Sequence, residues 1–316
     1  MKIGILTSGG DAPGMNAAIR AVVRTALNRG YVVYGIKNGY KGLIENDMSI
    51  LIHDDVSGML TKGGTFLGTA RLEEFADLAI QEKAYRVLKK RDINALVVIG
   101  GDGTYRGGLA LSKLGIKVVA VPATIDNDLG GTDFTIGFAT ALETITEAID
   151  KLRDTSSSHQ RCSIIEVMGR RCGDLAIFAG VCGGAEFIIT PNHMIDKQNL
   201  KNTLAKWQVE GRRHAIIVVT EKLFDVHALA KEITEETGFD TRSTVLGYVQ
   251  RGGYPVPNDR ILASRLGAYA IDLISDNKTG VAVGIRAGKL AYSSIEEAIE
   301  SKEENKDLFE LLEKVS

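Results

Sequence analysis

Two glycine-rich turns, each between a short apolar run and a stretch with helical periodicity, constrain the fold of this chain most. Gly9–Asp11 follows KIGILTS, and Gly100–Thr104 (GGDGT) follows INALVVI. Bare backbone N–H groups and a helix N-terminus can face an anion together at such a turn, and glycine has no Cβ to hold a phosphate away. One such turn alone is equally typical of a tight strand-to-helix connection that binds no phosphate. Two of them, with the TIDND segment Thr124–Asp128, indicate an enzyme that handles phosphate.

Short runs rich in Val and Ile recur between helical patterns and predict a largely parallel sheet covered by helices. The runs are KIGILTS, NALVVIGG, KVVAVPA, SIIEVMG, EFIIT, HAIIVVTE, TVLGYVQ and VAVGIRA. Helical spacing predicts helices at 15–29, 138–153, 196–210, 226–237 and 258–276, and a last charged helix over 294–315. This alternation predicts right-handed crossovers, with ligand sites at the carboxyl ends of the strands.

The length of 316 residues favours two lobes, with one large α/β unit as the alternative. The 38 basic and 40 acidic residues give a net charge of -2, which argues against a nucleic-acid surface. An anion site must then use locally clustered arginines. The amino terminus resembles a first strand rather than a signal peptide, and no apolar run approaches the roughly 20 residues that span a bilayer. We therefore expect a cytoplasmic protein without a membrane segment.

Several familiar catalytic patterns are missing from the sequence. Cys162, Cys172 and Cys182 form no CxxC pair, so we assign them no metal and expect small, buried or semi-buried side chains. The histidines have no HxH or HExxH spacing, and the chain contains neither GxSxG nor GxxxxGK[ST]. Phosphate chemistry here is therefore not of the P-loop type.

Three carboxylates follow predicted strands closely. Asp126 could take a proton from a substrate hydroxyl, and Asp128 could orient it or influence Mg2+. Asp102 could hold Mg2+, which takes few carboxylates plus phosphate oxygens. The alternatives are structural: TIDND could be an Asx-type turn, and Asp102 could be a helix N-cap.

Arginines near strand ends and turns suit phosphate, because the guanidinium fork binds it bidentately. Any one of them could instead form a surface salt bridge. The set is Arg71, Arg161, Arg170, Arg171, Arg242 and Arg251.

A set of segments extends in order over essentially the whole chain: TSGGDAPGMNAAIR, GGDGT, PATIDND, GGTDFTIGF, RDTSSSHQR, EVMGRRCGD, VVTE and VLGYVQRGG. Together, these segments closely resemble the bacterial ATP-dependent 6-phosphofructokinases. The resemblance implies two Rossmann-like α/β lobes, each a mostly parallel sheet covered by helices, with the active site in the cleft between them. It implies an ATP-binding lobe at 1–137 plus 252–300 and a sugar-phosphate-binding lobe at 138–251 plus 301–316. The implied reaction, in glycolysis, is Mg2+-dependent transfer of the γ-phosphoryl group of ATP to the 1-hydroxyl of fructose 6-phosphate, giving fructose 1,6-bisphosphate and ADP.

The resemblance also implies roles for individual residues. Asp126 is the base, with Thr124, Asp128 and Arg170 as further catalytic residues, and Asp102 holds Mg2+. The ATP side consists of Gly10, Arg71, Leu72, Gly101, Asp102, Gly103 and Thr104. The sugar-phosphate side consists of Thr124, Ile125, Asp126, Arg161, Met168, Gly169, Arg170, Glu221, Arg242, Tyr248, Val249, Gln250 and Arg251. Within a homotetramer, Arg161 and Arg242 reach the 6-phosphate from a neighbouring subunit.

Two small residues bear on the phosphoryl donor. Pyrophosphate-using relatives tend to carry aspartate after GGD and lysine before TID, whereas this chain has Gly103 and Ala123. ATP is therefore the expected donor. A pyrophosphate-dependent or other sugar-phosphate kinase is the alternative. A catalytically silent sensor or structural subunit is a third interpretation, disfavoured because Asp126, Arg161, Arg170 and Arg242 are all present.

The chain departs from the family pattern in two places. Tyr248 stands where a histidine is usual, and a phenol cannot become cationic, so sugar binding should be weaker or differently pH-dependent. In the effector pocket, His53, Gly58 and Glu210 replace arginine, aspartate and lysine, which predicts weak binding of ADP or phosphoenolpyruvate. The matching effector residues are Arg20, Arg24, Arg153, Gly184, Glu186, Arg212, Arg213 and His214.

Overall fold

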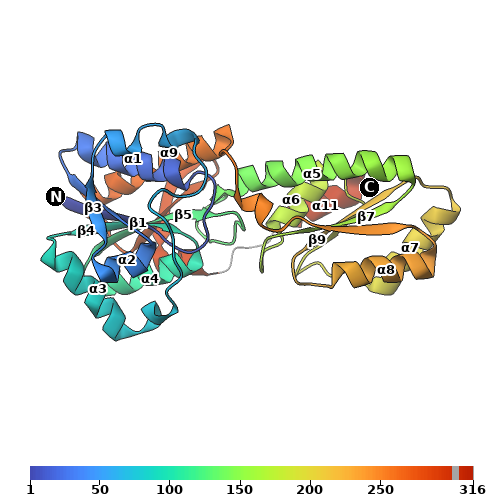
Figure 1. Ribbon diagram of the computed structural model, residues 1–316, viewed down its shortest axis with the longest axis horizontal. Coiled ribbons are helices and arrows are strands. Elements are labelled where there is room, and N and C mark those ends of the chain that lie inside the picture. Colours follow the sequence, from blue (N-terminus) through green and yellow to red (C-terminus); the bar gives the residue numbers. More distant parts are fainter. Residues whose placement is uncertain (301–305, 316) are drawn as a thin grey trace. The chain divides into compact units, whose positions relative to one another are not determined.

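The computed structural model describes residues 1–300 and 306–315. The chain forms two compact units, one of residues 1–140 with 251–300 and one of residues 141–250 with 306–315. We call them the first and the second unit. Each has its own sheet and helices (Figure 1), which confirms the predicted α/β fold with mostly parallel sheets.

The sheet of the first unit has the order β12-β11-β5-β4-β1-β2-β3, with β6 on β5. Its interior strands pair in parallel, and β3 and β12 run antiparallel at the two edges. Strands β4 and β5 are buried almost throughout because helices cover both faces. The bounds are β1 (Lys2–Thr7), β2 (Val32–Ile36), β3 (Met48–Leu51), β4 (Ala95–Gly100), β5 (Lys117–Thr124), β6 (Ile136–Gly137), β11 (Val281–Arg286) and β12 (Lys289–Ser294).

Helices cover this sheet on two faces: α1 and α9 pack together on one, and α2, α3 and α4 lie on the other (Figure 1). The latter helices enclose a core that includes Tyr40, Leu88 and Leu111. The bounds are α1 (Met15–Asn28), α2 (Gly39–Glu45), α3 (Leu78–Lys90), α4 (Asp102–Lys113), α9 (Pro257–Ser275) and α10 (Ile295–Ile299), with short 3-10 turns η1 (Asp54–Val56), η2 (Met59–Thr61) and η3 (Glu73–Ala76).

The second unit has a parallel sheet in the order β10-β7-β9-β8. Helices α7 and α8 cover one face over a core that includes Leu204, Leu229 and Phe239, and α6 packs on β9 and on α11. The bounds are β7 (Cys162–Val167), β8 (Phe187–Ile189), β9 (Ala215–Thr220), β10 (Thr241–Val245), α5 (Phe138–His159), α6 (Asp174–Cys182), α7 (Lys197–Val209), α8 (Val226–Thr237), η4 (Gly247–Arg251) and α11 (Lys306–Val315).

Two predicted elements are wrong. TVLGYVQ is not one strand, because β10 ends at Val245 and Gly247, with φ 56°, begins the 3-10 turn η4. The helix predicted over 294–315 is not continuous: α10 ends at Ile299, and Glu300 is extended, with φ -62° and ψ 147°. Packing explains this break, since α10 lies on α4 in the first unit and α11 on α6 in the second. Residues 301–305 of that prediction lie outside the described residues.

In the ranges 1–300 and 306–315, no helix is both long enough and apolar enough to cross a membrane.

One buried carboxylate anchors the junction of β6, α5 and α9. Asp259, 1% exposed in the first turn of α9, accepts hydrogen bonds from Gly137 N (2.8 Å), Thr140 N (2.8 Å) and Thr140 Oγ1 (2.5 Å). Burial raises the pKa of Asp259, although these hydrogen bonds oppose the shift. The segment from β6 to the start of α5 is therefore held to the first turn of α9 by this one side chain.

We expect Asp259→Ala to lower the free energy of unfolding by about 3 kcal/mol, because it leaves buried donors without an acceptor. Since the folded pKa lies above the ordinary 3.8, the stability that Asp259 contributes is fully present below that value and declines as pH rises through the folded pKa. Urea unfolding of wild type and of Asp259→Ala across this pH range measures the difference in stability. The control is Asp276→Ala, an exposed change at the end of the same helix. A stability difference that grows with pH would contradict the assignment.

Candidate active site

Three turns of the first unit meet at the carboxyl ends of neighbouring parallel strands. The turns follow β1, β4 and β5, which are adjacent in the sheet. Thr104 Oγ1 in the GGDGT turn donates a buried hydrogen bond of 2.9 Å to Ser8 O in the first turn. A Cβ at Gly100 would lie 2.3 Å from Thr104 Oγ1 and 2.5 Å from Ser8 O. The contact between these turns therefore requires glycine at position 100.

The TIDND turn lies against the GGDGT turn, because a Cβ at Gly101 would be 3.7 Å from Thr124 Cβ. Asp126 is buried, at 7% exposure, and its N–H donates to Thr124 Oγ1 at 3.2 Å. Asn127 has a left-handed backbone (φ 53°), and its amide bonds to Asp133 O (3.2 Å) and Thr135 N (2.9 Å). Asn127 thus holds the turn itself, and Asp126 lies next to the glycine turn.

Asp102 is the first residue of α4, and Gly101 is its N-cap. The N-cap alternative for Asp102 is therefore wrong. Its Oδ1 lies 2.9 Å from Arg106 Nε, and its side chain is 34% exposed. A Cβ on the next residue, Gly103, would meet nothing within 4 Å. The Asp102 side chain is thus partly exposed, and the neighbouring position 103 faces open space in which a ligand could sit.

The remaining predicted residues of the ATP side lie around these turns. A Cβ at Gly10 would be 2.9 Å from Arg251 Nη1, so the guanidinium of Arg251 rests against the first glycine turn. Arg71 is exposed, and Leu72, just before η3, packs on the edge of the core. Arg251, predicted on the sugar-phosphate side, thus contacts a residue predicted on the ATP side.

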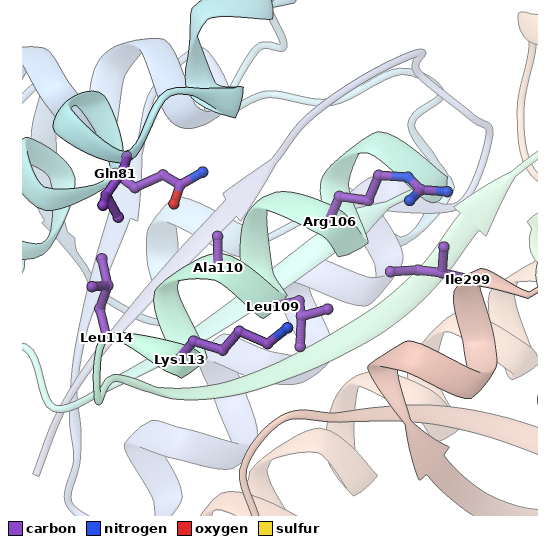
Figure 2. Close-up of a pocket in the computed structure, with 8 residues that line it drawn as sticks. Gln81, Arg106, Leu109, Ala110, Lys113, Leu114 and Ile299 are labelled. Atoms are coloured by element: carbon purple, nitrogen blue, oxygen red, sulfur yellow. The ribbon is translucent and has the colours of Figure 1, made fainter.

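The sequence did not point to a pocket of about 400 Å3 beside α4 (Figure 2). Apolar faces of α3, α4 and α10 form most of it, and Arg106 and Lys113 contribute the cationic groups. It was missed because apolar positions at helical spacing look the same in a core and in a pocket wall. Its lining consists of Leu78, Gln81, Arg106, Leu109, Ala110, Lys113, Leu114 and Ile299.

In the second unit, a tight turn after β7 carries Met168, Gly169 and Arg170. Met168 is buried, and Gly169 and Arg170 have φ of 134° and 59°. A Cβ at Gly169 would lie 2.5 Å from Cys172 O, so glycine is required there. Arg170 N donates to Glu221 Oε1 at 3.2 Å. These predicted sugar-phosphate residues therefore meet at the carboxyl ends of β7 and β9.

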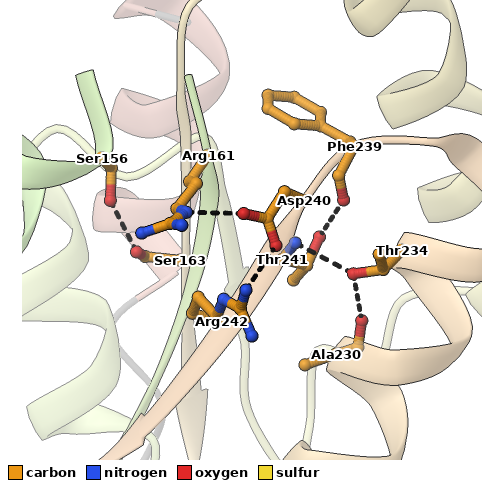
Figure 3. Close-up of polar contacts among 9 residues, drawn as sticks. All are labelled: Ser156, Arg161, Ser163, Ala230, Thr234, Phe239, Asp240, Thr241 and Arg242. Carbon is orange, nitrogen blue, oxygen red and sulfur yellow. Dashed lines mark hydrogen bonds and ion pairs between the residues drawn. The ribbon is translucent and has the colours of Figure 1, made fainter. Parts of the chain in front are cut away.

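Arg161 and Arg242 lie at the opposite end of the same sheet, where their side chains lie close together (Figure 3). Arg161 immediately precedes β7, whereas Arg170 follows it. The six residues of β7, at about 3.3 Å each, separate the two ends by about 20 Å. One chain therefore does not bring both arginine groups to one small ligand.

The predicted residues 248–250 differ in exposure. Tyr248 and Val249 are 79% and 64% exposed. Gln250 is fully buried: its Oε1 accepts from Met168 N (3.0 Å), and its Nε2 donates to Gly247 O (2.8 Å). Its side chain thus ties η4 to the turn after β7.

Five predicted effector residues gather in the second unit. Arg153 donates to Gly184 O (2.6 Å) and lies 3.0 Å from His214 Nε2. Arg212 pairs with Glu186 (2.8 Å) and stacks 4.0 Å from the ring of Trp207. Burial lowers the pKa of His214. The positive charges of Arg153 and Arg212 lower this pKa further, whereas the negative charge of Glu186 raises it.

The other three predicted effector residues make none of these contacts. Arg213 is an exposed residue between Arg212 and His214, and Arg20 and Arg24 are on α1 of the first unit. Burial lowers the pKa of Arg20, and Arg24 adds to the shift.

Comparison with known proteins identifies relatives over the whole chain. Residues 2–274 match the family model described as Phosphofructokinase. The ATP-dependent 6-phosphofructokinases of Aliivibrio salmonicida (strain LFI1238) and Aliivibrio fischeri (strain MJ11) are 53% and 52% identical over 316 residues, or 99% of each chain.

Solved structures agree on the fold. The phosphofructokinase from Saccharomyces cerevisiae is 36% identical, with a TM-score of 0.87 over 95% of this chain, which spans 45% of that longer one. The pyrophosphate-dependent phosphofructokinase from Marinobacter aquaeolei is 21% identical, with a TM-score of 0.86 over 96% of this chain and 85% of that one. This last likeness concerns the fold alone.

We expect Gly100→Ala to destabilise the first unit by about 2 kcal/mol, because the added methyl group separates two tightly packed turns. Gly103→Ala, three residues on in open space, is the matched control and should leave stability within about 0.5 kcal/mol of wild type. Urea unfolding measures both variants. Equal stabilities would contradict the close contact between the turns.

Proposed function

Because the chain belongs to the phosphofructokinase family, we propose how its own residues carry out the reaction. The activity is that of an ATP-dependent 6-phosphofructokinase, which transfers the γ-phosphoryl group of ATP to the 1-hydroxyl of fructose 6-phosphate, giving fructose 1,6-bisphosphate and ADP. The observation that carries the proposal is the contact of two glycine turns with the turn that bears Asp126.

Asp126 acts as the general base that accepts the proton of the 1-hydroxyl. A base must lie within hydrogen-bond reach of that proton, so its backbone must be fixed. The bond from Asp126 N to Thr124 Oγ1 (3.2 Å) and the bond from Thr135 Oγ1 to Thr124 O (2.6 Å) support such fixation. Asp128, two residues on, orients this group.

The two glycine turns and α4 bind the phosphates of ATP. Their backbone N–H groups and the helix N-terminus suit anions, and the open space at Gly103 leaves room for a phosphate. Phosphoryl transfer needs chiefly such positioning and charge neutralisation. With Ala123, Gly103 favours ATP over pyrophosphate as donor, in line with the names of the close relatives.

Asp102 is the residue that would hold Mg2+. Among residues 1–300 and 306–315, no three His, Cys, Asp or Glu side chains gather as a metal site. This fits Mg2+, which takes few carboxylates and completes its shell with water and phosphate oxygens. Bound there, the ion would supply neutralisation of phosphate charge. Arg106, paired with Asp102, balances the carboxylate charge.

Residues of two subunits bind the sugar phosphate. Met168, Gly169, Arg170 and Glu221 act from one subunit, and Arg161 and Arg242 act from a neighbour on the 6-phosphate. The length of β7 supports this division, because the two groups lie at its opposite ends. We therefore propose a homotetramer in which each site is completed by a second chain. We also propose a cytoplasmic location, since both substrates are cytoplasmic metabolites.

Effector control by ADP or phosphoenolpyruvate should be weak. Glu210, at the end of α7, places a negative charge where the family pattern has lysine. Arg212 is already engaged by Glu186 and Trp207, so an anion would have to compete for it. Both features oppose anion binding.

Asp126→Ala should lower the rate of fructose 1,6-bisphosphate formation by a factor of about 10^3, because general-base assistance is lost. A coupled assay with Mg2+, fructose 6-phosphate and either ATP or pyrophosphate measures it, and wild type should use ATP alone. Asp276→Ala is the control for an exposed aspartate. Near-normal activity of Asp126→Ala would contradict its role, and a folded wild type inactive with both donors would favour the silent-subunit alternative.

Glu210→Lys should strengthen inhibition by phosphoenolpyruvate several-fold, because it turns a repulsive charge into an attractive one. Activity at subsaturating fructose 6-phosphate measures this, and Trp207, the single tryptophan of the chain, reports binding by fluorescence. The control is Glu235→Lys, at an exposed site on α8. Strong inhibition of wild type at low effector concentration would refute weak control.

A further inference from the structure

One carboxylate joins the two arginines at the amino-terminal end of the second sheet (Figure 3). Asp240 Oδ2 accepts from Arg161 Nε at 2.6 Å, and Asp240 Oδ1 lies 3.2 Å from Arg242 Nη2. Neither the family resemblance nor the comparisons point to Asp240. The inference below rests on the proposed role of both arginines at the 6-phosphate.

The backbone on both sides of Asp240 is fixed. Phe239 is 1% exposed, and its carbonyl accepts from Thr241 Oγ1 at 2.7 Å. Thr241 N donates to Thr234 Oγ1 at 2.9 Å, which ties the start of β10 to α8. Asp240 O accepts from Cys162 N at 3.0 Å. The carboxylate therefore projects from a rigid support.

The backbone of Arg161 is held equally well. Its N–H donates to Ser156 O at the end of α5 (2.9 Å), and its carbonyl accepts from Ala215 N (3.3 Å). A buried hydroxyl pair, Ser156 with Ser163 at 2.6 Å, joins α5 to β7 beside it. These bonds do not hold the long side chain of Arg161, and it is Asp240 that accepts a hydrogen bond from its Nε.

The geometry leaves most of each guanidinium available. Arg161 uses Nε toward Asp240, and Arg242 uses one terminal nitrogen, out of five N–H donors in each group. The side chains of Arg161, Asp240 and Arg242 are 34%, 39% and 65% exposed, so a ligand can reach the free donors. With one carboxylate between two cations, the cluster keeps a net positive charge.

We propose that Asp240 is a positioning residue for the sugar phosphate, which holds Arg161 and Arg242 side by side so that both guanidinium groups meet one 6-phosphate. Without the Asp240 carboxylate, the two guanidinium charges repel each other, and both long arginine side chains must be ordered when the phosphate binds. Asp240 thus reduces the ordering needed for binding. Water and salt screen its own repulsion of the phosphate at this exposed site.

The test is a steady-state comparison of wild type with Asp240→Asn and Asp240→Ala. We expect KM for fructose 6-phosphate to rise about tenfold in Asp240→Ala, the size of one lost charge-assisted hydrogen bond, and less in Asp240→Asn. KM for ATP and kcat should stay near wild type. The matched control is Asp272→Asn, which breaks the exposed Arg29–Asp272 ion pair and should change no kinetic constant.

A double-mutant cycle separates positioning from a merely structural effect. Because Asp240 acts by holding Arg161 beside Arg242, Asp240→Ala should raise KM for fructose 6-phosphate clearly less in an Arg161→Ala background than in wild type. Thermal unfolding and the oligomer size of each variant, both expected to match wild type, verify folding.

An unchanged or lower KM in Asp240→Ala, with a raised KM in Arg161→Ala, would overturn the inference and leave the proposed function intact. An unchanged KM in Arg161→Ala would overturn both the inference and the assignment of Arg161 to the phosphate. Loss of kcat together with stability would show a structural role and would also overturn it.

Discussion

The direction of parallel strands is the constraint on which the rest of this structure depends. Because β1, β4 and β5 run the same way side by side, the turns that follow them lie at one edge of the sheet. The bond from Thr104 Oγ1 to Ser8 O and the close approach at Gly100 then join two of these turns. The third turn brings Asp126 beside them. Residues more than a hundred positions apart in sequence thereby form one surface, to which we assign the binding of phosphate.

The same constraint separates residues in the second unit. Arg161 and Arg170 are nine positions apart in sequence, yet one precedes β7 and the other follows it. Both belong to the predicted sugar-phosphate set, and the strand between them holds them at opposite ends of the sheet. Under the proposed assignment of both groups to one ligand, a complete site needs a second chain, which gives a physical reason for the proposed oligomer. Asp240 links Arg161 to Arg242 at the end that would be contributed to the neighbour.

The sequence predicted much of what local pattern determines: most of the buried strands, the helices α1, α5, α7, α8 and α9, and the glycine turns. The strand β2 and the amphipathic helix α3 were not predicted, although they carry the same kinds of local pattern. It failed where long-range packing decides, as at 294–315, where one helical pattern divides between two units. Gly247 shows a second limit, because a single left-handed residue ends a run that otherwise favours a strand. Asp240 was missed because an isolated acidic residue carries no motif, although its place two residues before Arg242 was a signal. The pocket beside α4 left no signal beyond helical periodicity.

Subunit complementation tests most directly whether each active site combines Asp126 of one chain with Arg161 of another. Asp126→Ala and Arg161→Ala proteins, each nearly inactive at low fructose 6-phosphate, are mixed in equal amounts, dissociated and reassembled. If sites are shared, about a quarter of them in random hybrids contain both intact residues, and activity recovers to about that fraction of wild type. Activity no greater than the sum of the two parents, in hybrids whose mixed composition is verified by mass spectrometry, would contradict the account.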